Sequence, residues 1–258
     1  MMRMKFNVLT LFPEMFTAVT KDSILGKANE KGIIDVNLID IREYSADKHK
    51  KVDDTPFGGG VGMTMFCQPV FDCLNELKPK KVIYMSPRGK IMDMDMIKRL
   101  SGEEEVTILC GHYEGVDQRI IDYFDMEEVS IGDYVLTGGE IPAMALIDAV
   151  SRFIPGVLGE EESAADESIY SGLLEADQYT KPQEYMGMKV PEVLTSGNHK
   201  NIALWKLENS IRLTAERRPD LFEKWVRSNP DLSRFTRRER EGIMRTINQL
   251  LTKKDQNR

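Results

Sequence analysis

The first half of the chain alternates short apolar runs with segments whose apolar residues recur at helical spacing. Five runs have the length and composition of buried strands: 5–11, 34–39, 81–85, 106–110 and 127–130. The segments 68–77 and 93–100 lie between such runs, as the helices that connect parallel strands do. This alternation predicts an α/β domain built on a parallel sheet.

Residues 142–153 are apolar nearly all round, which predicts a buried helix that has Pro142 in its first turn and ends at Pro155-Gly156. Residues 158–177 then carry seven acidic and no basic side chains, as a polar linker would. Together these patterns predict a sheet domain at 1–159 and an acidic linker at 160–177.

The carboxy-terminal part, 178–258, has a helical pattern. Asn198 is the expected N-cap of a helix. One buried stripe of that helix is predicted at Leu204, Leu207, Ile211 and Ala215. We therefore expect a small all-α domain after the linker.

The amino-acid composition excludes several classes of protein. At 258 residues and 41% hydrophobic content, the chain can build a core without disulfides. Its three cysteines form no CxxC pair and its three histidines have no zinc spacing, so we expect a reducing, cytoplasmic setting. No apolar run approaches the ~18 residues of a membrane span, and the amino terminus does not fit a signal peptide.

The charge is unevenly distributed. The whole chain has a net charge of −7, yet residues 198–258 contain 15 Lys and Arg against 8 Asp and Glu. A basic region on an acidic body is typical of an RNA-contacting module, because contacts to phosphates dominate such affinities. A solvated helical bundle explains the charge pattern equally well.

Glycine-bearing loops follow two of the predicted strands, at 111–119 and 131–139, and a third turn is expected at 86–89. Ligands bind at such strand ends in open α/β sheets. Neither glycine loop has the GxGxxG order of a dinucleotide site, which argues against a Rossmann cofactor. Backbone groups of three converging loops can instead bind an adenine edge and a ribose.

A fourth glycine-rich stretch, 56–63, follows the basic cluster 48–51. No Lys-Ser/Thr follows these glycines, so the signature of a nucleotide triphosphatase is absent. Glycine content favours a mobile loop. The basic cluster fits either an RNA clamp or a solvated surface.

Long motifs in this order resemble the bacterial tRNA (guanine-N(1)-)-methyltransferases of the TrmD family, and the match runs beyond Arg218. The motifs are Phe12-Pro-Glu-Met-Phe16, Phe57-Gly-Gly-Gly60, Gly62-Met63, Gly111-His-Tyr-Glu-Gly-Val-Asp117, Ser130-Ile-Gly-Asp-Tyr-Val-Leu-Thr-Gly-Gly-Glu140, Asp148-Ala-Val-Ser-Arg-Phe-Ile-Pro-Gly-Val-Leu158, Gly172-Leu-Leu174, Tyr179-Thr-Lys-Pro182 and Val193-Leu-Thr-Ser-Gly-Asn-His199. The resemblance implies a SPOUT methyltransferase, whose parallel sheet contains a deep trefoil knot that binds S-adenosylmethionine. It also implies a homodimer that methylates N1 of the guanine at position 37, in the anticodon stem-loop of tRNA.

The resemblance assigns the cofactor site to the strand-end loops. The residues are Pro87, Gly111, Tyr113, Glu114, Ser130, Ile131, Gly132, Asp133, Tyr134, Val135, Leu136, Gly138 and Gly139. It further implies a requirement for magnesium (Mg²⁺), although no cluster in the sequence defines a metal site.

The implied chemistry needs a base and a cation. Guanine N1 can attack a methyl group only as its proton leaves, and negative charge then spreads to O6. Arg152 matches the catalytic arginine of the family. Fifteen residues further, where the family has an aspartate followed by serine, this chain has Glu167 followed by Ser168. We therefore expect Glu167 to be the base, with its neighbour Asp166 as the alternative.

Two other functions remain open at this level. One is a SPOUT enzyme that methylates a different RNA, which the carboxy-terminal motifs disfavour. The other is a catalytically impaired protein that binds RNA or the cofactor, an idea supported only by the change from aspartate to Glu167. A phosphate-binding nucleotidase is opposed by the missing lysine after Gly62.

Overall fold

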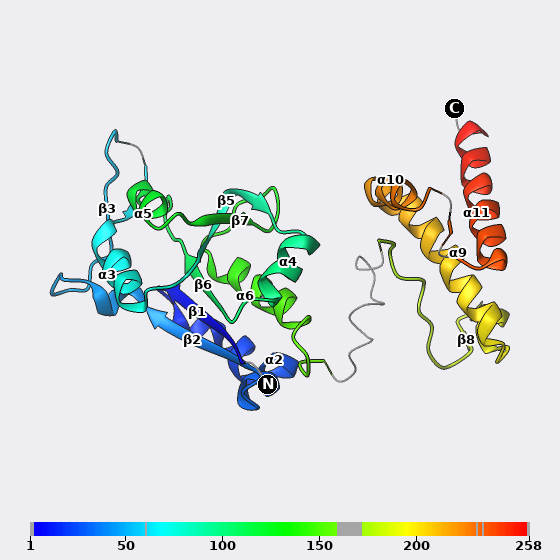
Figure 1. Cartoon of the computed structure of the whole chain (residues 1–258), viewed down its shortest axis with the longest axis horizontal. Helices are drawn as coiled ribbons and strands as arrows, with labels where there is room; N and C mark the ends of the chain where they lie inside the picture. Colours follow the sequence, from blue (N-terminus) through cyan, green and yellow to red (C-terminus); the bar gives the residue numbers. More distant parts are fainter. Residues whose placement is uncertain (1–2, 60, 159–171, 231, 234, 257–258) are drawn as a thin grey trace. The chain divides into compact units, whose positions relative to one another are not determined.

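The computed structural model describes residues 3–59, 61–158, 172–230, 232–233 and 235–256. The chain forms two compact units, Met1–Glu161 and Glu162–Arg258 (Figure 1). Within the described residues, no helix is long and apolar enough to cross a membrane.

The first unit alternates strands and helices. Its strands are β1 (Met4–Thr10), β2 (Ile34–Asp40), β3 (Asp53–Asp54), β4 (Thr64–Met65), β5 (Val82–Ile91), β6 (Glu105–Cys110) and β7 (Glu127–Ser130). Its helices are α1 (Thr17–Lys21), α2 (Ser23–Glu30), α3 (Cys67–Leu77), α4 (Met94–Ser101), α5 (Gln118–Tyr123) and α6 (Glu140–Ser151), with short 3₁₀ turns at Pro13–Phe16 and Ile41–Tyr44.

Five of these strands form one sheet in the order β2-β1-β6-β5-β7, and every pairing in it is parallel. Phe6 of β1 lies between Val36 of β2 and Val106 of β6, which places β1 inside the sheet. The predicted α/β architecture with a parallel sheet is confirmed. Each predicted strand begins within one residue of the observed start.

β5 corrects one expectation. The residues 86–89 were expected to form a turn after a strand that ends at Met85, but β5 continues to Ile91. Val129 of β7 pairs with both Met85 and Lys90, so the four residues between them form a bulge within the strand. Gly89 permits this, because a Cβ at that position would collide with the backbone N of Val129.

Helices cover both faces of the sheet (Figure 1), and side chains alternate between two buried clusters. Phe6 and Val8 of β1 join the cluster that α4 and α6 cover, whereas Leu9 joins the cluster with α3 and α5. This burial on both sides explains why the strands are nearly uniformly apolar.

α6 is the buried helix that the sequence predicts. Four of its apolar side chains, Ala143, Leu146, Ile147 and Val150, are fully buried. The helix starts at Glu140, two residues before Pro142, and is followed by Arg152 as its C-cap. α6 therefore connects the second glycine loop directly to the arginine that the family resemblance singles out.

The second unit is mainly helical. Its helices are α8 (Glu192–Thr195), α9 (His199–Arg217), α10 (Pro219–Ser228) and α11 (Arg237–Gln256). Asn198 is the N-cap of α9, as predicted, since its side chain accepts from the backbone N of Asn201. Leu173, Ile211, Trp225 and Ile243 form its buried cluster.

This unit departs from the all-α expectation in one respect. The strands β8 (Glu184–Tyr185) and β9 (Met188–Lys189) form a small antiparallel hairpin before α8. Most of the predicted acidic linker, including Asp166 and Glu167, lies outside the described residues.

Candidate active site

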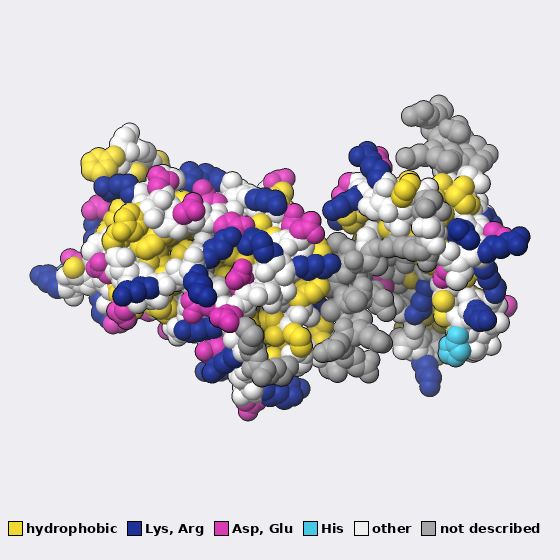
Figure 2. Space-filling model, viewed as in Figure 1, with side chains coloured by type: hydrophobic (Ala, Val, Ile, Leu, Met, Phe, Trp, Pro, Cys, Tyr) yellow, Lys and Arg dark blue, Asp and Glu magenta, His cyan; other side chains and the backbone are white. Residues whose placement is uncertain are grey.

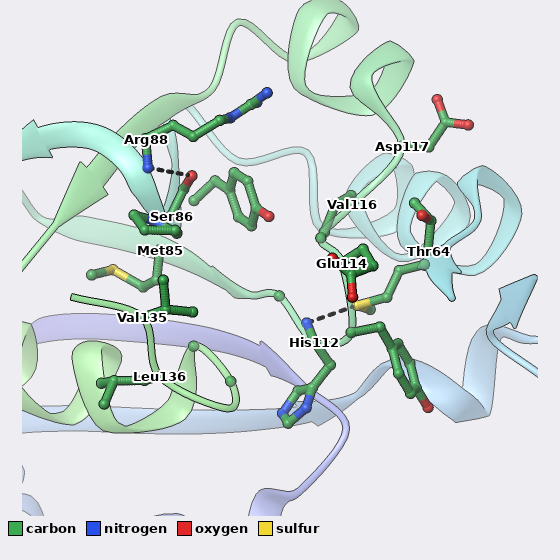
Figure 3. Close-up of a pocket in the computed structure, with 18 of the residues that line it drawn as sticks. Thr64, Met85, Ser86, Arg88, His112, Glu114, Val116, Asp117, Val135 and Leu136 are labelled. Atoms are coloured by element: carbon green, nitrogen blue, oxygen red, sulfur yellow. Dashed lines mark hydrogen bonds between the residues drawn. The ribbon is translucent and has the colours of Figure 1, made fainter. Parts of the chain in front are cut away.

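A cavity of about 960 Å³ opens at the bulge of β5 and at the ends of β6 and β7 (Figure 3). The bulge of β5 and the two glycine loops, 111–117 and 131–139, line it together with 54–57 and 64–66. The expected convergence of three segments at one end of the sheet is therefore present. In Figure 3, apolar Met85, Val135 and Leu136 face polar Glu114 and Thr64 across this space.

The two glycine loops contact each other directly. Gly139 N donates to Gly111 O at 2.8 Å, and His112 and Gly138 form an antiparallel β-bridge. A Cβ on Gly139 would lie 2.7 Å from Cys110 Cα, a backbone atom that cannot move aside alone. Glycine is thus required for the close approach that forms this wall of the cavity.

The glycine-rich stretch after β3 is attached to the first glycine loop. Met65 N donates to Gly115 O at 3.0 Å, and Glu114 N donates to Met63 O at 2.9 Å. A Cβ on Gly62 would lie 2.5 Å from Glu114 Oε1, so this glycine lets the two loops pack closely. The predicted mobile loop therefore has a fixed carboxy-terminal end at the cavity.

The side chain of Tyr84 in β5 packs against the first glycine loop. Its ring would meet a Cβ on Gly111 at 2.7 Å, and its hydroxyl lies 3.2 Å from the Cβ position of Gly115. Burial raises the pKa of this hydroxyl, so Tyr84 stays neutral and serves as a hydrogen-bonding wall residue.

A cluster around the buried Glu140 side chain lies behind the Gly138 wall. The Glu140 side chain is only 1% exposed. Its Oε1 accepts from Thr10 Oγ1 at 2.6 Å, and its Oε2 lies 2.7 Å from His112 Nε2. The ring of Phe12 packs against the imidazole of His112, with a centroid separation of 4.8 Å. We refer to Thr10, Phe12, His112 and Glu140 as the Glu140 cluster.

Charged side chains line the rim of the cavity on the side away from the Glu140 cluster (Figure 3). Arg119 forms two hydrogen bonds to the Asp117 carboxylate, and these bonds lower the pKa of Asp117 to about 2. Arg88 bonds Gln118 at 3.0 Å and pairs with Glu128 at 3.2 Å. Since Asp117 is ionised at neutral pH, this rim carries fixed charges of both signs.

Twelve of the thirteen residues expected at the cofactor line this cavity. Asp133 is the exception, since it is exposed on the loop and is not part of the lining. The structure thus brings the expected residues together, while their binding role stays a prediction.

Of the expected catalytic residues, only Arg152 lies within the described part of the chain, and it does not line the cavity. Arg152 follows α6 at the end remote from the cavity, and it is not among the lining residues. The twelve residues of α6 span about 18 Å at 1.5 Å per residue. Glu167 and Asp166 lie outside the described residues.

No group of His, Cys, Asp or Glu side chains in the described part of the chain could hold a metal ion. Magnesium therefore stays an expectation from the resemblance, with no ligands assigned among the described residues. The second unit, by contrast, presents many Lys and Arg side chains on the face of its helices shown in Figure 2.

Sequence reasoning assigned no role to Thr10 or Tyr84, and none to Glu140 or His112 beyond their place in the motifs. Thr10 and Glu140 are 130 positions apart, so only the sheet topology brings them together. One local feature could have pointed to Glu140: it directly follows two glycines and starts an otherwise apolar helix.

Comparison with known proteins identifies a matching family and several relatives that share one name. The family model described as tRNA (Guanine-1)-methyltransferase TrmD matches residues 4–224. The tRNA (guanine-N(1)-)-methyltransferase of Ruminiclostridium cellulolyticum is 58% identical over 232 residues, which cover 88% of this chain and 99% of the relative. The proteins of that name from Clostridium perfringens and Clostridioides difficile are 55% and 52% identical, covering 89% and 86% of this chain and 98% of each relative.

Proposed function

The chain belongs to the TrmD family of tRNA (guanine-1)-methyltransferases, and from this premise we propose that it transfers the methyl group of S-adenosylmethionine to N1 of the guanine at position 37 of tRNA. The observation that carries the proposal is the cavity at the bulge of β5 and the ends of β6 and β7. Its walls consist of the loops in which the family resemblance places the methyl donor.

The chemistry of the cavity fits this donor. Backbone groups of the two glycine loops border the cavity, and such groups can bind an adenine edge and a ribose. Apolar Met85, Val135 and Leu136 supply walls for the rest of the molecule. When bound, the donor would supply a sulfonium methyl group that a nucleophile can attack, with the neutral thioether as the leaving group.

Two side chains then complete the reaction. A carboxylate takes the proton from guanine N1, so that the N1 lone pair forms the new N–C bond while the S–C bond breaks. Such a base contributes roughly 10²–10⁴-fold. Arg152 stabilises the negative charge that reaches O6.

We assign the base to Glu167, on the spacing from Arg152 and the serine that follows. Turnover of Glu167→Gln and Asp166→Asn tests the choice. Loss of turnover in Glu167→Gln alone supports it, whereas full turnover there with loss in Asp166→Asn transfers the role to Asp166.

The position of Arg152 supports a homodimer. It lies a helix length of about 18 Å from the Gly139 end of α6, beyond the reach of its own side chain to the cavity. We propose that a second copy of the chain supplies Arg152 to the site. An Arg152→Ala chain, which keeps its cavity, should then regain turnover when mixed with a Gly139→Ala chain, which keeps its arginine. Light scattering that shows a monomer, or mixtures without activity, would contradict this arrangement.

The basic second unit fits binding of the anticodon stem-loop, because Lys and Arg provide phosphate contacts. The three free cysteines, Cys67, Cys73 and Cys110, fit a reducing cytoplasm.

Methyl transfer from labelled S-adenosylmethionine to two tRNA transcripts, with guanine or adenine at position 37, tests the whole proposal. Label in the guanine transcript alone is expected. Label in both transcripts would indicate methylation of another nucleotide. Label in neither, with donor binding intact, would indicate a catalytically impaired protein.

A further inference from the structure

We propose that the Glu140 cluster is a positioning device, which holds the Gly138-Gly139 wall in place and thereby sets the affinity for the methyl donor. This inference rests on the proposed function. It concerns four residues, Thr10, Phe12, His112 and Glu140, that lie behind or beside the wall.

The first step concerns the Glu140 carboxylate. At 1% exposure it is removed from water, and burial of a charge is costly unless hydrogen bonds compensate. Thr10 and His112 each bond one of its two oxygens. Its place in the first turn of α6 adds the favourable field of the helix amino terminus. His112 Nε2 and Glu140 Oε2 share one hydrogen bond, in which the imidazole is the donor to an ionised carboxylate.

The second step connects this bond to the cavity wall. A Cβ on Gly138 would collide with His112 Nε2 and would lie 2.6 Å from Glu140 Oε2. The Gly138 backbone therefore lies directly against the His112–Glu140 hydrogen bond. The β-bridge between His112 and Gly138 fixes the same two residues through their main chains. Any rearrangement of the pair must displace the backbone of the wall.

The third step is that the cluster closes on itself. Thr10 Oγ1 donates to Glu140 and accepts from Phe12 N at 3.0 Å. This bond orients Phe12, whose ring packs against His112. Arg42 lies over the Phe12 ring, 5.2 Å from its centroid. Each member thus limits the movement of the next, as a preorganised site requires.

The cluster acts through the wall and not on the reacting atoms. Both Glu140 oxygens are engaged and buried, so the carboxylate is not available to take a proton from a substrate. A device of this kind changes how well the donor binds, with little effect on turnover once the donor is bound. Its removal should therefore raise KM for S-adenosylmethionine and leave kcat nearly unchanged.

His112→Phe tests this inference, because it keeps a ring against Phe12 and removes the donor to Glu140. We expect the Kd for S-adenosylmethionine, measured by calorimetry, to rise roughly tenfold or more, since a buried acceptor is left unsatisfied. At saturating donor, kcat should stay within about twofold of the parent. His112→Gln retains an N–H at a similar position and should recover part of the affinity.

Thr10→Val is the second variant, since it is isosteric and removes the other bond to Glu140. Thr20→Val is its matched control, because Thr20 bonds a backbone carbonyl remote from the cavity. A folded His112→Phe protein with the parent's Kd would overturn the inference. Should His112→Phe fail to fold, a parent-like Kd in Thr10→Val would overturn it instead. A parent protein that does not bind S-adenosylmethionine would refute the proposed function itself.

Discussion

The two units of the chain differ in how they are stabilised and in what they carry. The first unit, Met1–Glu161, has a five-stranded parallel sheet with buried clusters on both faces and a cavity at its strand ends. The second, Glu162–Arg258, is built around a buried cluster of Leu173, Ile211, Trp225 and Ile243. Its charge is basic beyond residue 198, although the whole chain is acidic.

Under the proposed function, this difference separates two physical tasks. Chemistry needs atoms held within about 0.5 Å of a productive geometry, which a large buried core and interlocked loops can provide. Attraction to an RNA backbone needs positive charge at the surface and little precision. The acidic unit contains the cavity and Arg152, and the basic unit provides the charge.

Arg152→Ala should have the largest effect and should separate chemistry from binding. We expect turnover to fall by about 10²–10³-fold, the loss typical of removing one group that stabilises a developing oxyanion. Calorimetry with S-adenosylmethionine should give the parent's Kd, because the role proposed for Arg152 is at guanine O6 and its own chain's cavity lacks it. A variant that no longer binds the donor would show that Arg152 has a structural role instead.

Some of this organisation could be predicted from the sequence. Apolar runs such as 106–110 identify strands, because burial on both sheet faces leaves no polar alternation to interpret. The strand-end loops were also predicted, since glycines follow those runs directly. The local pattern therefore identified most residues of the cavity.

The features that the sequence did not predict depend on contacts between segments that are far apart in the chain. β5 continues past residues 86–89 because Lys90 and Ile91 pair with β7, which no local pattern reveals. The hairpin β8–β9 was missed because its strands have two residues each. Asp133 was included because its neighbours in the motif line the cavity, yet the loop places it outside the lining.

Ile211→Ala should destabilise the second unit by about 2–5 kcal/mol, since it removes a fully buried side chain from a small core. Both tryptophans, Trp205 and Trp225, lie in this unit, so their fluorescence during denaturation reports on it alone. Donor binding, which reports on the first unit, should persist where the fluorescence transition has already occurred. Leu146→Ala, at a fully buried site in α6, is the matched variant and should do the reverse. Simultaneous loss of both signals would mean that the units unfold as one.

Replacement of surface charges should have a smaller effect, confined to RNA. Lys200→Gln with Lys206→Gln removes two exposed cations from α9. We expect KM for tRNA to rise and the slope of log K against log salt to decrease by about 0.9 for each phosphate that the protein no longer neutralises. Lys27→Gln with Lys98→Gln, exposed positions of the first unit, is the control. Equal effects of both pairs would show that the basic unit has no special part in RNA binding.

The smallest expected effect comes from two similar ion pairs, one in each unit. Asp117 pairs with Arg119 at 2.7 Å, and Asp220 pairs with Arg218 at 2.6 Å. Hydrogen bonds from Arg119 lower the pKa of Asp117 to about 2, and Arg218 lowers that of Asp220. A lowered pKa in the folded state stabilises the protein above the unfolded value of about 3.9. For Asp117 this contribution is lost as the pH falls from about 4 to about 2.

Asp117→Asn should therefore reduce the free energy of unfolding at pH 7, but by no more than about 1 kcal/mol, because the Arg119 side chain is 74% exposed and water screens the pair. Denaturation followed by circular dichroism at pH 7 and at pH 3 measures the difference between parent and variant, which should narrow at the lower pH. Asp220→Asn is the matched control, since both members of the Asp220–Arg218 pair are largely exposed, and we expect no resolvable change in tryptophan fluorescence transitions. A larger loss in Asp220→Asn would mean that the second unit depends on its surface charges for stability as well as for RNA.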